Sequence, residues 1–314
     1  MHYRNLGRSG LRVSVLGLGC NYFGWRIGLE EARAVVHRAL DGGITLFVTA
    51  DIYGGSGGSE TQLGEILGAQ RKEIVLATKV GMAMDPEGRR KGGSRRHIMA
   101  SVEESLRRLK TDWIDLYQLH QPDPLTPIDE TLRAFDDLVR QGKVRYVGCS
   151  NLPAWEVARS RHVAEKLGLE HFVSAQDEYS LVVRGAGKEL LPALEAYGMG
   201  LLPYFPLASG LLTGKYRRGG EMPGDSRFQN VGRLANRYLT EGNWDLVERL
   251  SAFAEERGHS LVELAFGWLL AHPVVASVPA GATRPDQVEA NIRAAEWLPS
   301  AEDMQAIGQI IGGA

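Results

Sequence analysis

Eight short β-rich runs alternate with longer helical patterns along this 314-residue chain. This order implies repeated strand–helix–strand units built around a parallel sheet. Eight is the number of units that closes a (β/α)8 TIM barrel, and several of the runs are continuously apolar, as strands buried on both faces are. The predicted strands span residues 15–20, 45–50, 74–80, 114–120, 144–150, 172–178, 200–205 and 275–279.

Helical periodicity occupies the intervals between the predicted strands. Residues 30–40, 98–109 and 129–142 each place apolar side chains on one helix face. A glycine ends the first and the third of these patterns, as glycines commonly do in helices. No change of composition and no low-complexity tract marks a domain boundary, so we expect residues 1–314 to form a single barrel domain.

Three segments depart from a plain barrel. Residues 3–15 carry a turn-like sequence at 7–10 and are expected to form an N-terminal hairpin. The long connection 208–243 after the seventh strand should lie over the carboxyl-terminal rim, where barrel enzymes have their active sites. The glycine-rich residues 54–59 lack the Gly-Lys-Ser/Thr ending of a P-loop, so we expect a flexible rim loop there.

Composition and charge exclude several classes of protein. Hydrophobic residues make up 44% of the chain and the net charge is −2, so neither nucleic acid nor a membrane is expected as a partner. No apolar run reaches the roughly 20 residues of a membrane span, and the start lacks the apolar stretch of a signal peptide. Cys20 and Cys149 are the only cysteines. We therefore expect a cytoplasmic protein without disulfides or a metal, and a solvated loop at the basic run 89–91.

Three chemically suited side chains fall at the carboxyl ends of different predicted strands. They are Tyr53, Lys79 and His120, and in a barrel such ends meet at one rim. Reduction of a carbonyl group needs an acid that protonates the developing alkoxide. A tyrosine, with a pKa of about 10, becomes a better acid beside an ammonium group that favours its phenolate form. His120 could orient the carbonyl oxygen by a hydrogen bond.

The sequence around these residues resembles the aldo-keto reductase family. Residues 47–54 read Phe-Val-Thr-Ala-Asp-Ile-Tyr-Gly, where the family usually has Phe-Asp-Thr-Ala-x-x-Tyr-Gly, and residues 77–81, 116–123, 142–148 and 206–216 add further matches. The branch related to the potassium-channel β-subunits is the most similar. The resemblance implies a TIM barrel that reduces aldehydes or ketones to alcohols with NADPH, Tyr53 acting as general acid beside Lys79 and His120.

The resemblance also implies a set of cofactor-binding positions. Ser150, Asn151 and Gln176 would hold the carboxamide, and Tyr204 would stack on the nicotinamide. The whole set comprises Cys20, Asn21, Ser150, Asn151, Gln176, Tyr204, Phe205, Pro206, Leu207, Ser209, Leu212, Lys215, Arg227, Gly281, Thr283, Arg284, Gln287 and Asn291.

At the other end of the cofactor the family implies phosphate and adenine contacts. Lys215 and Arg227 would reach the pyrophosphate and Arg284 the 2′-phosphate, because a guanidinium matches phosphate geometry. Asn291 would contact the adenine. The family usually has Glu before this Asn, and here it is Ala290, which implies weaker anchoring of the adenine.

Three aromatic residues follow the first predicted strand. Tyr22, Phe23 and Trp25 could form the wall of an apolar substrate pocket or pack into the core. The sequence leaves both interpretations open, and it does not identify the physiological substrate.

Val48 stands where the family has its catalytic Asp. We expect Lys79 to lose its counter-charge and its pKa to fall. Asp51 lies an odd number of residues away, so an extended chain would point it to the other face of the strand. Val48 could be an engineered substitution, a natural change in a slow enzyme, or the mark of a non-catalytic NADP(H)-binding module that senses redox state. Retention of Tyr53, Lys79 and His120 favours an enzyme with impaired activity.

Overall fold

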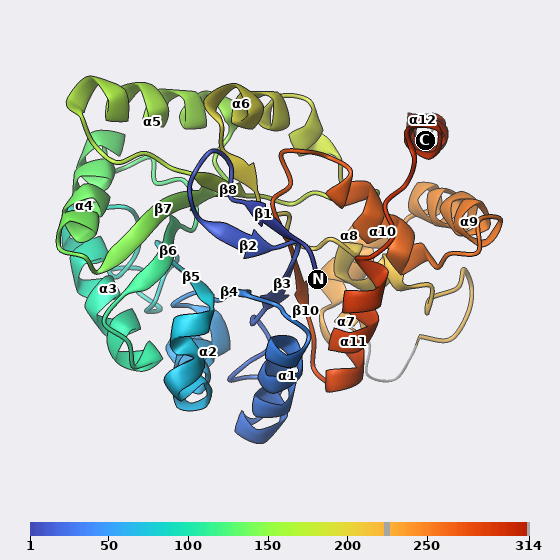
Figure 1. Ribbon diagram of the computed structural model, residues 1–314, viewed down its shortest axis with the longest axis horizontal. Coiled ribbons are helices and arrows are strands. Elements are labelled where there is room, and N and C mark those ends of the chain that lie inside the picture. The colour runs from blue at the N-terminus through green and yellow to red at the C-terminus, as the bar shows by residue number, and fades with distance from the viewer. Residues whose placement is uncertain (223–226, 313–314) are drawn as a thin grey trace.

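Eight parallel strands form the centre of the molecule. The computed structural model describes residues 1–222 and 227–312, and the strands follow one another in the order β10-β3-β4-β5-β6-β7-β8-β9. Figure 1 shows them curling around a common axis, with most of the helices outside. Their bounds are β3 Leu16–Gly19, β4 Leu46–Val48, β5 Val75–Val80, β6 Ile114–Leu119, β7 Val144–Ser150, β8 Ser174–Gln176, β9 Gly200–Leu201 and β10 Val278–Gly281.

The sheet closes between β9 and the residues that precede β10. Leu201 donates a backbone hydrogen bond to Val274 (2.7 Å) and accepts one from Ala276 (3.1 Å). The predicted (β/α)8 barrel is therefore confirmed. The predicted strand 275–279 is only partly right, because residues 274–276 form this seam and regular pairing with β3 begins at Val278, opposite Leu16.

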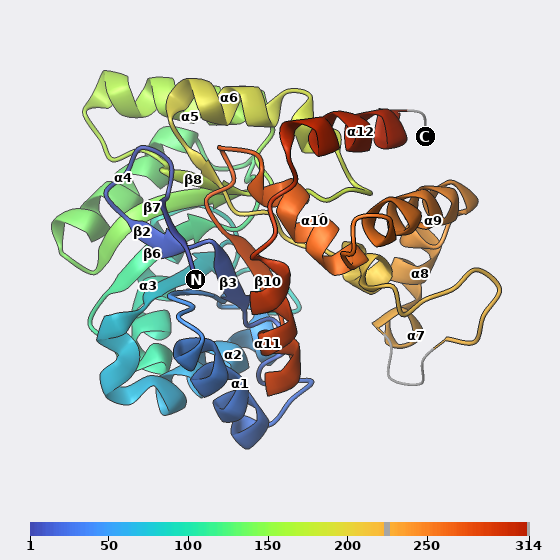
Figure 2. The same cartoon turned by 45° about the vertical axis from the view of Figure 1, so that its right-hand side comes forward.

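Helices surround the barrel at the positions that the apolar periodicity predicts. Three of them, α1, α3 and α4, match the predicted helices to within three residues at either end. Figure 2 shows the last helix, α12, away from the strands, and it packs against α9. The bounds are α1 Leu29–Asp41, α2 Tyr53–Leu67, α3 Arg95–Leu109, α4 Ile128–Arg140, α5 Ala154–Leu167, α6 Leu190–Tyr197, α7 Arg227–Asn230, α8 Gly232–Tyr238, α9 Glu241–Glu255, α10 Leu261–Leu270, α11 Pro285–Ala294 and α12 Ala301–Gly312, with short 3-10 helices η1 Gly68–Glu73, η2 Gly185–Gly187 and η3 Ala208–Thr213.

The predicted N-terminal hairpin is present and closes one end of the barrel. Strands β1 (Tyr3–Asn5) and β2 (Arg12–Ser14) pair in antiparallel fashion, and Figure 1 shows them lying across the barrel axis. Leu6 and Val13 are fully buried and pack with the side chains that fill the barrel interior. This apolar interior column consists of Leu6, Val13, Leu46, Val48, Ala77, Leu116, Leu202 and Ala276. Val48 thus continues the apolar interior toward the opposite rim.

The long connection after β9 contains helices of its own. Within the described residues it comprises η3, α7 and α8, which lead directly into α9. Glu178, just after β8, accepts hydrogen bonds from Arg237 (2.5 Å) and from the Tyr238 hydroxyl. A largely buried carboxylate therefore joins the end of the connection to the barrel, in addition to the apolar side chains that the connection packs into the core.

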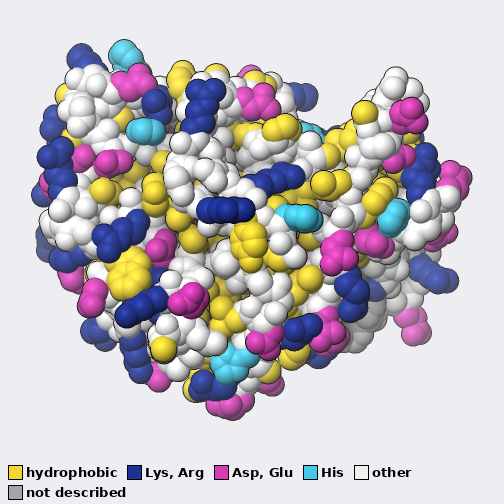
Figure 3. Space-filling model, viewed as in Figure 1, with side chains coloured by type: hydrophobic (Ala, Val, Ile, Leu, Met, Phe, Trp, Pro, Cys, Tyr) yellow, Lys and Arg dark blue, Asp and Glu magenta, His cyan; other side chains and the backbone are white. Residues whose placement is uncertain are grey.

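Charges of both signs are interspersed on the hairpin face of the molecule. Figure 3 shows Lys and Arg side chains scattered among Asp and Glu over this face, without a large patch of one sign. Across the part of the chain that the structure covers, no helix has both the length and the apolar character of a membrane span.

Candidate active site

Tyr53 begins α2 immediately after a short turn that follows β4. The next four residues have left-handed backbone angles, with φ of +69° at Ser56 and +117° at Gly57. A Cβ added at Gly57 would lie 2.6 Å from Arg108 Cδ, so the guanidinium stem fits here only against glycine. The flexible rim loop predicted for residues 54–59 is therefore wrong: the segment is a defined first turn of the helix, and it fixes where Tyr53 lies.

Lys79 projects from β5 into the rim beneath Tyr53. Its side chain is almost completely buried, and its Nζ donates to the Thr49 carbonyl (2.9 Å) and to the Tyr53 hydroxyl (3.4 Å). Among the described residues no ion pair joins this ammonium to a carboxylate. Burial lowers the pKa of Lys79 to about 7, against a smaller raising effect of Asp51, Cys20 and Glu60. The fall expected from the sequence is thus present.

His120 follows β6 and faces the same tyrosine. The two rings meet edge to face with centroids 5.7 Å apart. Burial, and secondarily the charge of Lys79, hold the pKa of His120 well below its usual range. Its Nδ1 is buried and has no hydrogen-bond partner within the described part of the chain. The imidazole is therefore neutral near pH 7 and can donate one hydrogen bond toward the rim.

Val48 lines the cavity that these three residues share. Its side chain is 3% exposed and belongs to the apolar column of the barrel interior. Its isopropyl group carries no charge, and the described residues place no carboxylate within ion-pair distance of the Lys79 ammonium.

One large cavity, of about 1210 Å³, opens at this rim. It extends from the tyrosine along α11 as far as Ala294, a span lined by residues of β3, β10 and the connection after β9. The predicted site residues that line it are Cys20, Asn21, Tyr22, Tyr53, Lys79, His120, Ser150, Asn151, Gln176, Tyr204, Phe205, Pro206, Leu207, Ser209, Lys215, Gly281, Thr283, Arg284, Gln287 and Asn291.

Four predicted residues do not line the cavity as the structure describes it. Phe23 and Leu212 are fully buried in the hydrophobic core. Trp25 is 58% exposed and stacks on Tyr22, with ring centroids 6.4 Å apart. Of the three aromatic residues after the first strand, only Tyr22 lines the cavity, so the alternative of core packing holds for Phe23. Arg227 begins α7, but its side chain lies outside the described residues.

Amide and hydroxyl groups are linked below one end of the cavity. Asn151 donates to the His120 carbonyl (3.0 Å) and accepts from the Tyr204 hydroxyl (2.8 Å), and Ser150 donates to the Gln176 carbonyl (2.7 Å). These contacts fix the side chains of Ser150 and Asn151 at the rim, beside His120 and Tyr204.

Sequence reasoning missed a second glutamine behind this group. Gln118 donates from Nε2 to Gln176 Oε1 (3.2 Å) and is fully buried in β6. An amide inside the otherwise apolar run 116–119 was the signal, because buried polar groups are kept only where they find partners. Further residues that line the cavity and were not predicted are Arg26, Met82, Gln121, Arg233 and Arg293.

Cationic groups gather at the other end of the cavity. Arg284 precedes α11 and pairs with Asp286 through two 3.0 Å contacts, both side chains being well exposed. Gly281 ends β10, and a Cβ added there would lie 3.0 Å from the ring of Tyr22. Gly281 therefore lets the Tyr22 ring pack against the end of β10, on the part of the cavity wall between the tyrosine end and Arg284.

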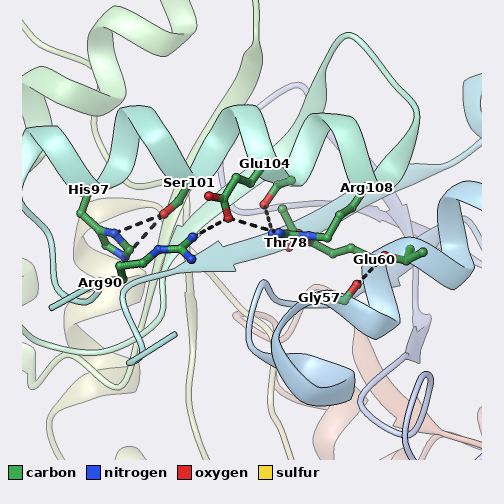
Figure 4. A network of polar contacts seen from close by, with 10 residues as sticks. Gly57, Glu60, Thr78, Arg90, His97, Ser101, Glu104 and Arg108 are labelled. Carbon is green, nitrogen blue, oxygen red and sulfur yellow. Dashed lines mark hydrogen bonds and ion pairs between the residues drawn. The ribbon is translucent and has the colours of Figure 1, made fainter. Parts of the chain in front are cut away.

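A buried ionic network lies behind the rim, between α2 and α3. Glu60 is fully buried and accepts from Thr78 Oγ1 (2.5 Å) and from Arg108 Nε (2.7 Å). Figure 4 shows Arg108 and Glu104 on one helix, reaching toward Glu60 on the other and toward Arg90. The network ties the left-handed turn, and with it Tyr53, to the neighbouring helix.

Comparison with known proteins identifies the family to which a chain with this site belongs. A profile of the aldo/keto reductase family matches residues 15–311. The chain belongs to the aldo/keto reductase family. The match covers almost the whole chain, including every strand of the barrel and all the cavity residues, and so agrees with the motif resemblance in the sequence.

Individual relatives of this aldo/keto reductase carry different names. A protein of Oryza sativa subsp. japonica named "Probable voltage-gated potassium channel subunit beta" is 39% identical over 307 residues, covering 95% of this chain and 92% of its own. An Escherichia coli K12 protein named "L-glyceraldehyde 3-phosphate reductase" is 36% identical, covering 99% and 92%. An "Uncharacterized oxidoreductase YrpG" of Bacillus subtilis is 37% identical, covering 100% and 97%.

Family membership supports oxidoreductase chemistry on carbonyl groups with a nicotinamide cofactor in general. The residues that the structure describes contain no cluster of three His, Cys, Asp or Glu side chains arranged to hold a metal ion.

Proposed function

We propose that this protein reduces the carbonyl group of aldehydes or ketones to an alcohol with NADPH. The observation that carries the proposal is the Tyr53 hydroxyl, 3.4 Å from the Lys79 ammonium and facing a neutral His120, at one end of a cavity of about 1210 Å³. This arrangement places an acid, a cation that strengthens it and a hydrogen-bond donor around one point.

Each side chain has a distinct task in this proposal. The Tyr53 hydroxyl donates its proton to the carbonyl oxygen as negative charge develops there. Lys79 stabilises the phenolate that remains, and His120 orients the oxygen by a hydrogen bond from its neutral imidazole. When bound, the nicotinamide cofactor supplies the hydride. At neutral pH only part of the Lys79 population is charged, since its pKa is about 7, so we expect slow turnover.

The chemistry of the lining supports NADPH as the cofactor. Amides suited to a carboxamide occupy one end, and Lys215 and Arg284 bring cationic charge to the other. Gly281 lines the cavity between the two ends, where its missing side chain leaves room for the Tyr22 ring. Cationic side chains favour a phosphorylated ligand, and Arg284, exposed beside α11, is the group that would take a 2′-phosphate and so prefer NADPH over NADH.

A second candidate is an NADP(H)-binding module with little or no catalysis. Val48 favours it, because the buried ammonium of Lys79 has no carboxylate in contact. Two plant relatives bear the name of potassium-channel β-subunits. The retained tyrosine, lysine and histidine favour the enzyme.

Tyr53→Phe tests the proposal. Oxidation of NADPH would be followed with a reactive aromatic aldehyde, and NADPH binding by fluorescence in the same samples. We expect turnover to fall at least a hundredfold with binding unchanged, whereas Tyr197→Phe on the outer helix α6 serves as the control and keeps full turnover. Unchanged turnover in Tyr53→Phe would show that Tyr53 is not the acid. NADPH binding without turnover in the wild type and in Tyr53→Phe alike would support the non-catalytic NADP(H)-binding module.

A further inference from the structure

Gln118 is a buried amide inside the barrel. It lies two residues after Leu116, a member of the apolar interior column, so both side chains point to the same face of β6. The Gln118 side chain is fully inaccessible to solvent. Its Nε2 donates to Gln176 Oε1 (3.2 Å), whereas its Oε1 has no hydrogen-bond partner among the described residues. One half of this amide is thus satisfied, and that half is the donor to Gln176.

The hydrogen bond between the two glutamines spans the strand that separates them. β7 lies between β6 and β8, and at this level the three strands place Gln118, Gly148 and Ser174 opposite one another. A Cβ added at Gly148 would lie 3.1 Å from Gln118 Cγ and 2.7 Å from Ser174 Oγ. The missing side chain of Gly148 therefore leaves the room in which Gln118 reaches over β7 to Gln176.

Gln176 carries this contact to the wall of the cavity. It lines the cavity and is 4% exposed. Its main-chain carbonyl accepts from the Ser150 hydroxyl (2.7 Å) and from the Asn151 amide (3.2 Å), which fixes its backbone. Because its Oε1 accepts from Gln118, its Nε2 is the end of the side-chain amide that remains for a ligand. Gln176 is therefore oriented as a hydrogen-bond donor.

We infer that Gln118 is a positioning residue that holds the amide of Gln176 with its Nε2 toward the cavity, so that Gln176 selects a hydrogen-bond acceptor there. This inference rests on the proposed function, in which that acceptor is the carboxamide oxygen of the nicotinamide. An amide that turns by 180° exchanges its donor for its acceptor. Gln118 removes this freedom before a ligand binds, and such preorganisation strengthens binding.

The other neighbour of Gln118 does not account for its amide. Lys79 stands opposite Gln118 on β5, but the Lys79 ammonium donates to the Thr49 carbonyl and to the Tyr53 hydroxyl. A buried amide oxygen without a partner destabilises a fold, and an apolar side chain would fill the same space without that cost. The donation to Gln176 is thus what a glutamine at this position contributes.

Gln118→Met removes the donor and keeps a side chain of similar length. Calorimetry would measure the binding of NADP+, of its acetylpyridine analogue, and of 2′-phospho-ADP-ribose, which has no nicotinamide. We expect the affinity for NADP+ to fall by about tenfold, as for one lost hydrogen bond, and that for 2′-phospho-ADP-ribose to stay unchanged. The analogue has a methyl group in place of the amide nitrogen and keeps the oxygen, so its affinity should fall by the same factor as that of NADP+.

A double-mutant cycle separates positioning from a general disturbance of the barrel. If Gln118 acts through Gln176, Gln118→Met has no further effect on NADP+ affinity when Gln176→Met is already present. Ser174→Ala is the matched control, because Ser174 is fully buried in the same layer and its hydroxyl has no partner within the described residues. It should leave NADP+ affinity unchanged. If Gln118→Met does not fold, Gln118→Leu removes the same donor with a smaller side chain.

Unchanged NADP+ affinity in the folded Gln118 variant would overturn the inference, and so would additive losses in the double variant. If Gln176→Met weakens NADP+ but not the acetylpyridine analogue, Gln176 faces the cavity with its oxygen, which contradicts the assigned orientation. An equal loss of affinity for 2′-phospho-ADP-ribose would show that the whole site is deformed, also against the inference. These results concern binding alone and stand apart from the proposed reduction, which fails instead if Tyr53→Phe retains full turnover.

Discussion

The Lys79 ammonium lies 3.4 Å from the Tyr53 hydroxyl, and both are positioned by the same short segment after β4. The contact joins a strand residue to the first residue of a helix whose opening turn is left-handed. The contact that the proposed acid and its activating cation require is therefore present, while burial lowers the pKa of the cation. The predictions below separate these two aspects.

Val48→Asp should raise turnover, most strongly at alkaline pH. An adjacent carboxylate raises the pKa of an ammonium by about 1–3 units, so Lys79, with a pKa of about 7, would stay charged to higher pH. We expect about a ten- to a hundredfold gain near pH 9 and a smaller one near pH 6, where Lys79 is already charged. Rates of NADPH oxidation across pH 6–10 measure this, and an equal gain at every pH would contradict an effect through Lys79.

His120→Ala should lower turnover by about a hundredfold, the usual effect of losing one hydrogen-bond donor to a developing oxyanion. The wild-type profile of kcat/KM should show no limb near pH 6.5 from His120, because its folded-state pKa lies well below that value. Below pH 6.5 the imidazole of His120 is protonated in the unfolded chain but not in the native protein, so the wild type loses stability as the pH falls. The His120→Ala variant should show a smaller loss of stability over the same pH range. His162→Ala on α5 is the control, with an exposed imidazole.

Glu60→Gln should destabilise the fold by about 3 kcal/mol, because the buried guanidinium of Arg108 loses its closer carboxylate, at 2.7 Å, and keeps only Glu104 at 3.3 Å. Combining Glu60→Gln with Arg108→Met should recover part of the lost stability. Urea unfolding would give the free energy of unfolding of the wild type, the single variant and the double variant. Glu87→Gln breaks a pair in which both side chains are well exposed and should change stability by less than about 0.5 kcal/mol; a similar cost in both pairs would argue against burial as the cause.

Gly57→Ala and Gly55→Ala make a matched comparison in the left-handed turn. Both glycines have positive φ, but an added Cβ at Gly57 meets Arg108 Cδ at 2.6 Å, while at Gly55 nothing lies within 4 Å. We expect about 1 kcal/mol of strain at Gly55 and about 2–3 kcal/mol at Gly57. Denaturant unfolding gives both values, and only Gly57→Ala should also reduce turnover, since Tyr53 begins the same turn.

Arg284→Gln should weaken NADPH binding by about tenfold or more and leave NADH binding nearly unchanged, because only NADPH carries the 2′-phosphate. Fluorescence titration with each cofactor measures the ratio. Ala290→Glu, which restores the usual family residue, should strengthen both. Equal losses of affinity for NADPH and NADH in Arg284→Gln would show that this guanidinium contacts a group that both cofactors carry.

The barrel and its rim follow from periodicity, but two local features do not. Strands and helices were predictable because each carries its own apolar pattern, and Tyr53, Lys79 and His120 because strand ends converge. The left-handed turn was not, since consecutive glycines permit many conformations and Arg108, distant in sequence, selects one. The environment of Asp51 was equally hidden, because Glu60 and Arg108 act on it through space rather than along the strand.

Predictions of single aromatic residues were the weakest. Tyr22, Phe23 and Trp25 follow one another within four positions, yet one lines the cavity, one is in the core and one is exposed. Neither strand nor helix periodicity applies to that loop, so its sequence does not indicate which side chains point into the core, into the cavity or into solvent. The eighth strand was misplaced for a related reason: its first residues pair with Leu201 across the seam, and nothing local in the sequence marks that seam.

Glu178 is a polar point of attachment for the connection that forms one wall of the cavity. It holds Arg237 and Tyr238, and residues of the same connection, from Ser209 to Arg233, form one wall of the cavity. If this wall has to move when a bound ligand leaves, the two contacts of Glu178 have to break at the same time. We therefore expect the contacts of Glu178 to affect the dissociation rate of a bound ligand more than its equilibrium affinity.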